Sequence, residues 1–168
     1  MKISDALLPE FDLEMATTRK CLVRIPDNKF SFKPHPKSFD MGALAVHIAT
    51  MLDWGVVTLQ SDSFDYAPVA GEPYVPPVAK TNAELLAMFD SASAKFRAAL
   101  AMAENDSMMA PWSLLGGGVT MFTMPRAAVL RGMIFNHIVH HRGQLSVYLR
   151  LCDIPVPAMY GPSADEAN

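Results

Sequence analysis

Apolar residues recur every three or four positions along four stretches of the chain, and this spacing predicts four amphipathic helices. We place them at residues 7–25, from residues 38–40 through Leu59, at residues 81–104 and at residues 125–152. Four such helices favour an all-α fold, a four-helix bundle with the apolar faces as its core. We treat residues 1–168 as a single domain, because a chain of 168 residues can bury one sizeable core.

Local signals mark the expected starts of three of these helices. The stretch from Ser38 to Asp40 offers good N-capping residues for the second helix. Thr81 is followed three residues later by Glu84, which matches a capping box at the start of the third. Pro125 suits the first turn of the fourth helix, where its missing N–H is not needed.

The segments outside the helices carry residues that disfavour helix. Prolines at positions 68, 73, 76 and 77 exclude a regular helix in that linker. Glycines at 116–118 and the β-prone residues 119–122 indicate a short extended segment before the last helix. Residues 155–168 are rich in proline, small and acidic residues, so we expect an irregular tail.

Composition and charge exclude several classes of protein. The formal net charge is −3, and no basic stripe is present to neutralise phosphates, so we expect no nucleic-acid partner. No apolar run approaches about 18 residues, so we expect no membrane partner. The N-terminus lacks a secretory signal, and Cys21 and Cys152 form no CxxC pair and are expected to be free thiols. Together these features predict a cytoplasmic location.

The most informative pattern is a pair of histidines in the last predicted helix. His137 and His141 are four residues apart, so they differ by only about 40° around the helix axis. They lie on the apolar stripe Leu130, Ile134, His137, His141, Leu145 and Tyr148. His47 lies on an apolar face of another predicted helix. Three imidazoles from two helices could bind one metal ion and leave coordination positions open, as in catalytic sites.

A second interpretation of these histidines stays open at this point. Each of His47, His137 and His141 could be a core histidine whose ring nitrogens find a backbone carbonyl or a carboxylate. His140 lies about 100° from His141 on the helix and is expected at the rim or surface. His35 lies between two prolines and receives no role.

Two neighbours of the histidine pair are candidates for supporting roles. Gln144 lies one turn beyond His141 and could orient a ligand or a bound water, or be an ordinary polar residue. Arg142 could bind a substrate carboxylate, or form an ion pair on the helix surface.

These segments resemble a known family. Residues 45–49 read AVHIA, residues 136–145 read NHIVHHRGQL, and residues 148–150 read YLR. In this order they are similar to the DinB family of DinB/YfiT-like metalloenzymes. The resemblance implies a four-helix bundle with a metal site at His47, His137 and His141, which frequently holds zinc, nickel or iron. It also implies homodimers, and thiol transfer or isomerisation with low-molecular-weight thiols in the characterised branches.

The sequence and the resemblance together give three functional hypotheses. The first is a metal-dependent enzyme that transfers or adds a small thiol to an electrophilic small-molecule substrate, with zinc or nickel preferred and iron as a further candidate. The second is a metal-dependent hydrolase at the same site. The third is a non-catalytic bundle that binds a metal or small molecule in stress response.

Overall fold

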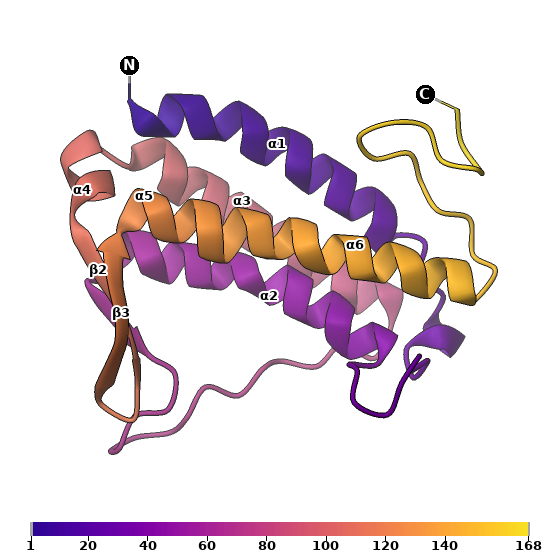
Figure 1. Ribbon diagram of the computed structural model, residues 1–168, viewed down its shortest axis with the longest axis horizontal. Coiled ribbons are helices and arrows are strands. Elements are labelled where there is room, and N and C mark those ends of the chain that lie inside the picture. Colours follow the sequence, from indigo (N-terminus) through magenta and orange to yellow (C-terminus); the bar gives the residue numbers. More distant parts are fainter. Residues whose placement is uncertain (1, 168) are drawn as a thin grey trace.

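Four long helical segments run side by side along the molecule in the computed structural model, which describes residues 2–167 (Figure 1). In chain order the elements are α1 (Ile3–Leu22), the 3₁₀ turn η1 (Asp27–Lys29), α2 (Met41–Gln60), β1 (Ser63–Asp65), α3 (Asn82–Met102), α4 (Asn105–Met109), β2 (Pro111–Gly116), β3 (Val119–Pro125), α5 (Arg126–Val129), the π-helix η2 (Leu130–Phe135) and α6 (Asn136–Leu151).

The predicted helices are all present, with shifted ends. The first begins at Ile3, four residues earlier than expected, because distant and local side chains satisfy its first donors. Asn105 Oδ1 accepts from the Ile3 N–H at 2.7 Å, and an Asp5 carboxylate oxygen accepts from the Lys2 N–H at 2.9 Å. A contact from a residue so far along the chain leaves no signal in the local pattern.

Two of the predicted helix caps can be checked directly. Asp40 caps α2 as predicted, because its Oδ1 accepts from the Ala43 N–H at 2.7 Å. At the start of α3 the Thr81 hydroxyl accepts from the Glu84 N–H at 3.2 Å. The Glu84 carboxylate, however, accepts from Lys80 N–H at 2.7 Å rather than from Thr81, so this capping box is only half formed.

The prediction of an all-α fold is wrong, because a three-stranded sheet closes one end of the helices. β1 pairs in parallel with β2, and β2 pairs antiparallel with β3. The turn between β2 and β3 has Gly117 and Gly118 at φ +63° and +77°, which suits a two-residue hairpin. The expected extended residues 119–122 lie within β3. β1 was missed because it has three residues and pairs Ser63 with Ser113, far along the chain.

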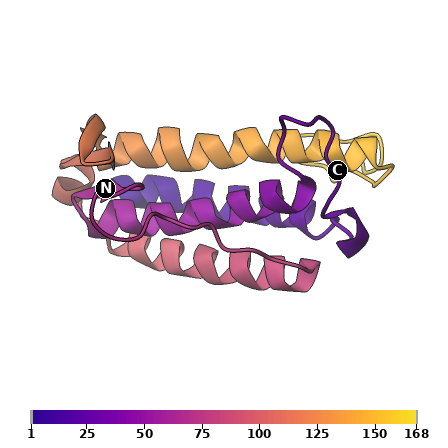
Figure 2. The same cartoon turned by 90° about the horizontal axis from the view of Figure 1, so that it is seen from below.

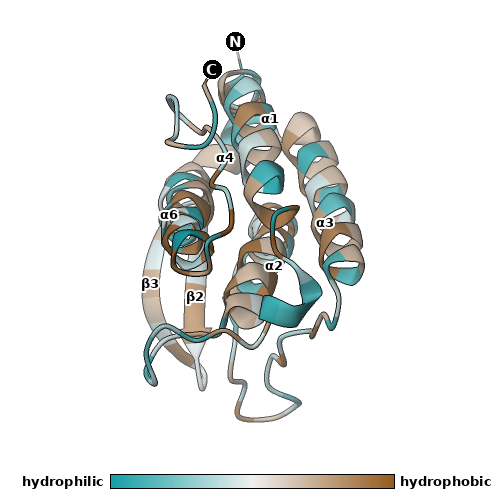
Figure 3. Cartoon of the chain, turned by 90° about the vertical axis from the view of Figure 1, so that its right-hand side faces the viewer, coloured by the Kyte–Doolittle hydropathy of each residue, from teal (hydrophilic) through white to brown (hydrophobic). Residues whose placement is uncertain are grey.

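An aromatic cluster fills the middle of the helical layer. Phe11 of α1, Phe96 of α3 and Phe135 of η2 meet edge to face, with ring centroids 5.2 to 6.2 Å apart. Gly55 lets α2 approach this cluster, because a Cβ there would lie 2.7 Å from the Phe96 ring. Figure 3 shows the brown, hydrophobic sides of the helices turned toward one another.

α2 is the central helix of the fold. Viewed from below, α6 and α3 lie on opposite sides of the molecule with α2 between them (Figure 2). By length and composition α2 could cross a membrane, but 61% of its apolar stretch is buried by the other helices. Its hydropathy is therefore that of a core helix.

Two irregular segments complete the molecule. The proline-rich linker between β1 and α3 runs back along the length of the bundle beside α2 (Figures 1 and 2). The tail after α6 is irregular through residue 167, as predicted, and folds back onto the helices, while the predicted last residue, Asn168, lies outside the described residues. Asp165 fixes it by accepting from Arg150 at 2.5 Å and from the Val156 N–H at 2.9 Å.

Candidate metal centre

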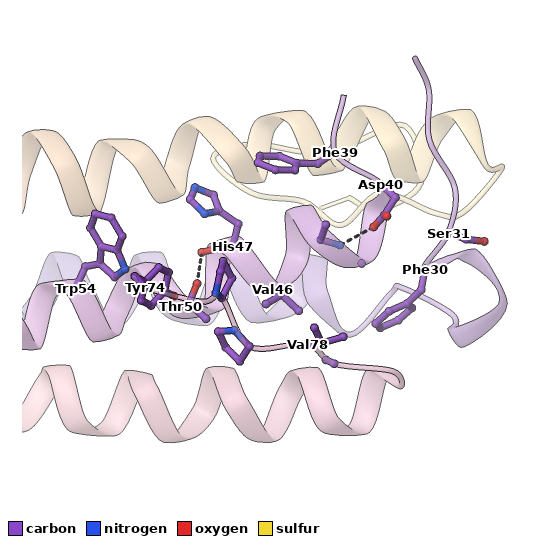
Figure 4. Close-up of a pocket in the computed structure, with 15 residues that line it drawn as sticks. Phe30, Ser31, Phe39, Asp40, Val46, His47, Thr50, Trp54, Tyr74 and Val78 are labelled. Atoms are coloured by element: carbon purple, nitrogen blue, oxygen red, sulfur yellow. Dashed lines mark hydrogen bonds between the residues drawn. The ribbon is translucent and has the colours of Figure 1, made fainter. Parts of the chain in front are cut away.

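His47 lies in the second turn of α2 and faces α6. Its ring is half-buried and packs 5.8 Å from the ring of Phe39, which precedes the helix. Figure 4 shows the two rings beside each other on the side of α2 that faces the pale yellow helix. The Asp40 cap fixes where α2 begins, and with it the direction in which His47 points.

His137 and His141 lie at the start of α6, directly after the π-helix η2. The last wide turn is closed by the Asn136 N–H, which donates to the carbonyl of Arg131 five residues earlier. A single π turn inserts one residue into a helix and changes the direction of everything after it. The predicted apolar stripe from Leu130 to Tyr148 is half-buried or buried at every position.

The structure brings the three predicted histidines together. His47 Nε2 and His137 Nε2 are 3.5 Å apart, and the His141 ring centroid lies 4.7 Å from that of His47 and 4.6 Å from that of His137. One nitrogen from each ring lies within 4.8 Å of the others. With metal–nitrogen bonds of about 2.0–2.1 Å, the ligand nitrogens of two imidazoles on one tetrahedral ion are about 3.4 Å apart. The cluster could therefore hold one metal ion.

Hydrogen bonds on the far side of two rings fix their orientation. Gln144 Oε1 lies 2.8 Å from His141 Nδ1, so that nitrogen carries the proton and Nε2 keeps its lone pair. The Met133 backbone carbonyl hydrogen-bonds to His137. Because the Nε2 atom of His137 faces His47, Nδ1 is the nitrogen left for this carbonyl. This is the arrangement that supports histidine ligands of metals.

The electrostatics of the cluster keep the rings neutral. Burial, and then the neighbouring His141 and His137, lower the pKa of His47 to about 4. Burial and His141 lower the pKa of His137, and the Met133 hydrogen bond opposes this shift. Burial also lowers the pKa of His141, against the effect of Gln144. Neutral imidazoles offer free lone pairs at pH 7, as metal ligands must.

The remaining histidines lie outside the cluster, as expected. His140 is exposed, and its Nε2 lies 3.1 Å from Gln144 Nε2. Gln144 therefore touches both His141 and His140. His35 is exposed in the loop before α2, where its Nδ1 accepts from the Lys37 N–H at 3.2 Å.

Arg142 points away from the histidines. Its guanidinium forms a 2.7 Å ion pair with Glu14, donates to the Thr18 hydroxyl at 3.1 Å and lies over the Tyr160 ring. The expected surface position is wrong, since the side chain is 1% exposed. Arg142 is not among the residues that line the cavities next to the cluster, so the structure does not bring it to a substrate there.

Two cavities meet at His47. The first, which we call the groove, has a volume of about 630 Å³ and lies between α2 and the proline-rich linker (Figure 4). The second, which we call the chamber, has about 70 Å³ and lies between α2, the β2–β3 hairpin and η2. Both are bordered by His47 and Trp54, and the chamber is also bordered by His137.

The chamber includes a residue that the sequence did not single out as functional. Trp112 looks like an ordinary packing residue in the sequence, because nothing in the local pattern connects it with the histidines. The β1–β2–β3 sheet carries it to the end of the bundle, where it lines the chamber together with His137. Its position depends on a sheet that the helical periodicity could not reveal.

Comparison with known proteins identifies the family. The model of the DinB family matches residues 3–168. The chain belongs to the DinB family. It is 28% identical over 164 residues to the uncharacterized protein YrdA of Bacillus subtilis (strain 168), covering 96% of this chain and 90% of that protein.

Two solved DinB-like structures have the same fold. The protein from Bacillus cereus ATCC 10987 superposes with a TM-score of 0.73 at 23% identity, covering 95% of this chain and 98% of the other. The protein YjoA of Bacillus subtilis gives 0.69 at 18% identity, covering 90% and 96%. Each match covers at least 90% of this chain, so the likeness is one of overall fold.

Proposed function

We propose that this DinB protein is a metal-dependent enzyme that transfers or adds a small thiol to an electrophilic small molecule. The observation that carries the proposal is the convergence of His47, His137 and His141 from two helices at the border of two cavities. A structural metal would be enclosed by four protein ligands, whereas three histidines leave positions open. The ligand assignment is part of the proposal.

The donor set suits a divalent transition ion. Three imidazoles favour zinc, nickel or iron over magnesium or calcium, and we propose zinc or nickel, with iron as the third candidate. When bound, such an ion lowers the pKa of a thiol or a water molecule beside it. Gln144 and the Met133 carbonyl would fix the orientation of the His141 and His137 rings before the ion binds.

The chain's own thiols do not compete for this role. Cys21 is buried, and burial raises the pKa of its thiol to about 11, so it is not a reactive thiolate at neutral pH. Cys152 follows the last turn of α6, about 16 Å from His141 at 1.5 Å per residue. A separate small thiol is therefore the nucleophile that we propose.

The residues around the groove favour thiol chemistry over hydrolysis. A hydrolase needs a side chain that holds and moves the proton of the attacking water. Asp40 is the carboxylate that lines the groove, and one of its oxygens already caps α2. A thiol gives up its proton far more easily than water, so it depends less on such a base.

The test combines metal analysis with turnover. Protein purified without a histidine tag should contain about one equivalent of zinc, nickel or iron, and the metal-loaded protein should turn over with a panel of thiols and electrophiles. Turnover of esters or amides alone would favour the hydrolase. Full activity after metal removal would exclude both metal-dependent enzymes, whereas bound metal without any turnover would favour the non-catalytic bundle.

Two variants control this test. His141→Ala should lose the metal but keep the fold, because the core is mostly apolar. His35→Ala also removes a histidine, but an exposed one in a loop, and it should keep the metal. Equal metal contents in the two variants would contradict the ligand assignment.

A further inference from the structure

Trp112 holds a buried hydrogen-bond donor that nothing satisfies. Its side chain is 3% exposed. Among the buried side-chain nitrogen and oxygen atoms of residues 2–167, the indole Nε1 of Trp112 is the one without a hydrogen-bond partner. Buried donors are almost always paired, since an unpaired one loses its bond to water and gains nothing. The Trp112 side chain also lines the chamber, so we take its unpaired N–H as a donor for a group that arrives from outside.

The surroundings of the indole do not suit a trapped water molecule. The Thr58 hydroxyl in the chamber wall already donates to the Trp54 carbonyl at 2.9 Å. The wall is otherwise apolar apart from the histidine rings and the Trp54 indole, and Trp112 also borders a void of about 110 Å³ beside Asp53, Phe64 and Tyr74. A buried water needs two to four polar partners, so it would be poorly held here.

The volumes and lining residues of the groove and the chamber together indicate the shape and charge of one ligand. The chamber, at about 70 Å³, has room for a small polar end of a molecule, and the groove, at about 630 Å³, has room for its body. Figure 4 shows Trp54, Tyr74 and Phe39 among the side chains that line the groove together with His47. Neither cavity is lined by a lysine or an arginine, so a carboxylate or phosphate bound away from the histidine cluster would lack a cationic side chain beside it.

We propose that the substrate is an uncharged α,β-unsaturated carbonyl compound with an apolar body. Its carbonyl oxygen accepts the Trp112 N–H in the chamber, and its body lies in the groove between the aromatic side chains. The inference rests on the proposed thiol transfer for the reaction, but the binding site stands on the cavity and the orphan donor.

The reaction that this placement serves is an addition. The thiol sulfur forms a bond to the β-carbon, the electrons of the carbon–carbon double bond move toward the carbonyl, and negative charge develops on its oxygen. The proton lost by the thiol ends on the α-carbon, so no oxidant or reductant is required. A fixed N–H in a dry site stabilises that developing charge.

An epoxide fits the same chamber less well. Opening an epoxide leaves a strongly basic alkoxide, which needs a proton donor beside the oxygen. The chamber wall offers the Trp112 N–H, which does not give up its proton, and no carboxyl, thiol or phenol group. The enolate of a carbonyl compound is less basic and can be protonated at carbon by water, which takes up the thiol proton in exchange.

The indole signals of the protein provide the test. The chain has two tryptophans, so proton–nitrogen correlation spectra contain two indole N–H resonances, and Trp54→Phe identifies which is which. The probes are benzylacetone, a saturated ketone that cannot react, butylbenzene, which lacks the oxygen, and hydrocinnamate, which carries a charge. We expect benzylacetone to bind and to shift the Trp112 signal downfield, and hydrocinnamate not to bind.

A matched variant measures the hydrogen bond itself. Trp112→Phe keeps an aromatic ring but removes the N–H, and it should weaken benzylacetone binding by about tenfold while leaving butylbenzene binding within about twofold. Equal weakening of both probes would reduce Trp112 to packing and overturn the proposal. If the variant does not fold, the shift of the Trp112 signal in the unaltered protein decides alone.

The outcomes separate this inference from the proposed function. If benzylacetone leaves the Trp112 signal unmoved while metal-dependent thiol turnover is present, the inference fails and the proposed function stands. If the ketone binds at Trp112 but no thiol adds to benzylideneacetone, the binding site stands and the reaction fails. Faster turnover of styrene oxide than of benzylideneacetone would overturn the assignment of the carbonyl class.

Discussion

Gln144 touches two imidazoles at once and is the residue on which the geometry of His141 depends. Its carbonyl oxygen lies 2.8 Å from His141 Nδ1, and its amide nitrogen lies 3.1 Å from His140 Nε2. Gln144→Leu removes the acceptor, so we expect zinc affinity to fall about 10–100-fold in a competition titration with a coloured chelator. Gln144→Glu keeps an acceptor and should bind within a few-fold of the unaltered protein. Unchanged affinity in the Leu variant would contradict the role.

Acid should destabilise the metal-free protein through its histidines. His47 has a pKa of about 4 when folded, lowered by burial and by its histidine neighbours, against about 6.5 in an unfolded chain. Between these values the unfolded state binds the extra proton, so the free energy of unfolding falls as the pH drops from about 6.5 towards 4. Urea unfolding of the metal-free protein at several pH values measures this, and His47→Gln should flatten the curve. A stability that rises with acid in this range would contradict the account.

At the scale of single residues, most of the histidine cluster could be predicted from the sequence. The four-residue spacing of His137 and His141 and the helical position of Gln144 are local properties, so they could be read from the chain. Arg142 could not be placed, because its partners Glu14 and Tyr160 come from a different helix and from the tail. The position of Trp112 beside the histidines depends on the β1–β2–β3 sheet, so the local sequence pattern gave no signal for it.

Among the elements, the π-helix η2 sets the direction of the ligand helix. Deleting Gly132 should restore ordinary helical hydrogen bonds and rotate His137 and His141 by about 100° relative to α5. A Cβ at Gly132 would meet no atom within 4 Å, so the deletion itself leaves no cavity in the core. We expect circular dichroism to show retained helix and calorimetric titration to show lost zinc binding.

The control for this deletion is Gly132→Ala, which keeps the length of the segment and should still bind zinc. Zinc binding by the deletion variant with unaltered affinity would mean that η2 has no part in placing the histidines.

The periodic pattern predicted one continuous helix here, because a single extra residue barely disturbs the spacing of apolar positions. The helices were predictable for the same reason, whereas the three-residue strand β1 offered no period to detect.

For the whole molecule, the buried ion pair between Arg142 and Glu14 joins α6, α1 and the tail. Arg142 is 1% exposed, and Tyr160 donates to both Glu14 oxygens at 2.9 Å. Arg142→Ala leaves a buried carboxylate without its partner, so we expect a loss of about 3–5 kcal/mol in the free energy of unfolding, measured in urea. Arg19→Ala breaks an exposed ion pair with Asp90 and should cost less than about 1 kcal/mol. Similar losses in both variants would contradict this account.

Assembly and location are properties of the whole molecule that remain predictions. The homodimer rests on the family resemblance, and the cytoplasmic location rests on sequence features such as the N-terminus and the two unpaired cysteines. The bundle itself was predictable because amphipathic helices leave few other ways to bury their apolar faces. The sheet that closes it was not, since its parallel pair joins segments on either side of α3.

The most direct test of the central claim is a crystal of the untagged protein grown with zinc and measured at the zinc absorption edge. We expect one anomalous peak for each chain, from a zinc ion that lies between His47, His137 and His141 and is bonded to a nitrogen of each. No peak at that position, or zinc held only by exposed residues such as His35 or His140, would contradict it.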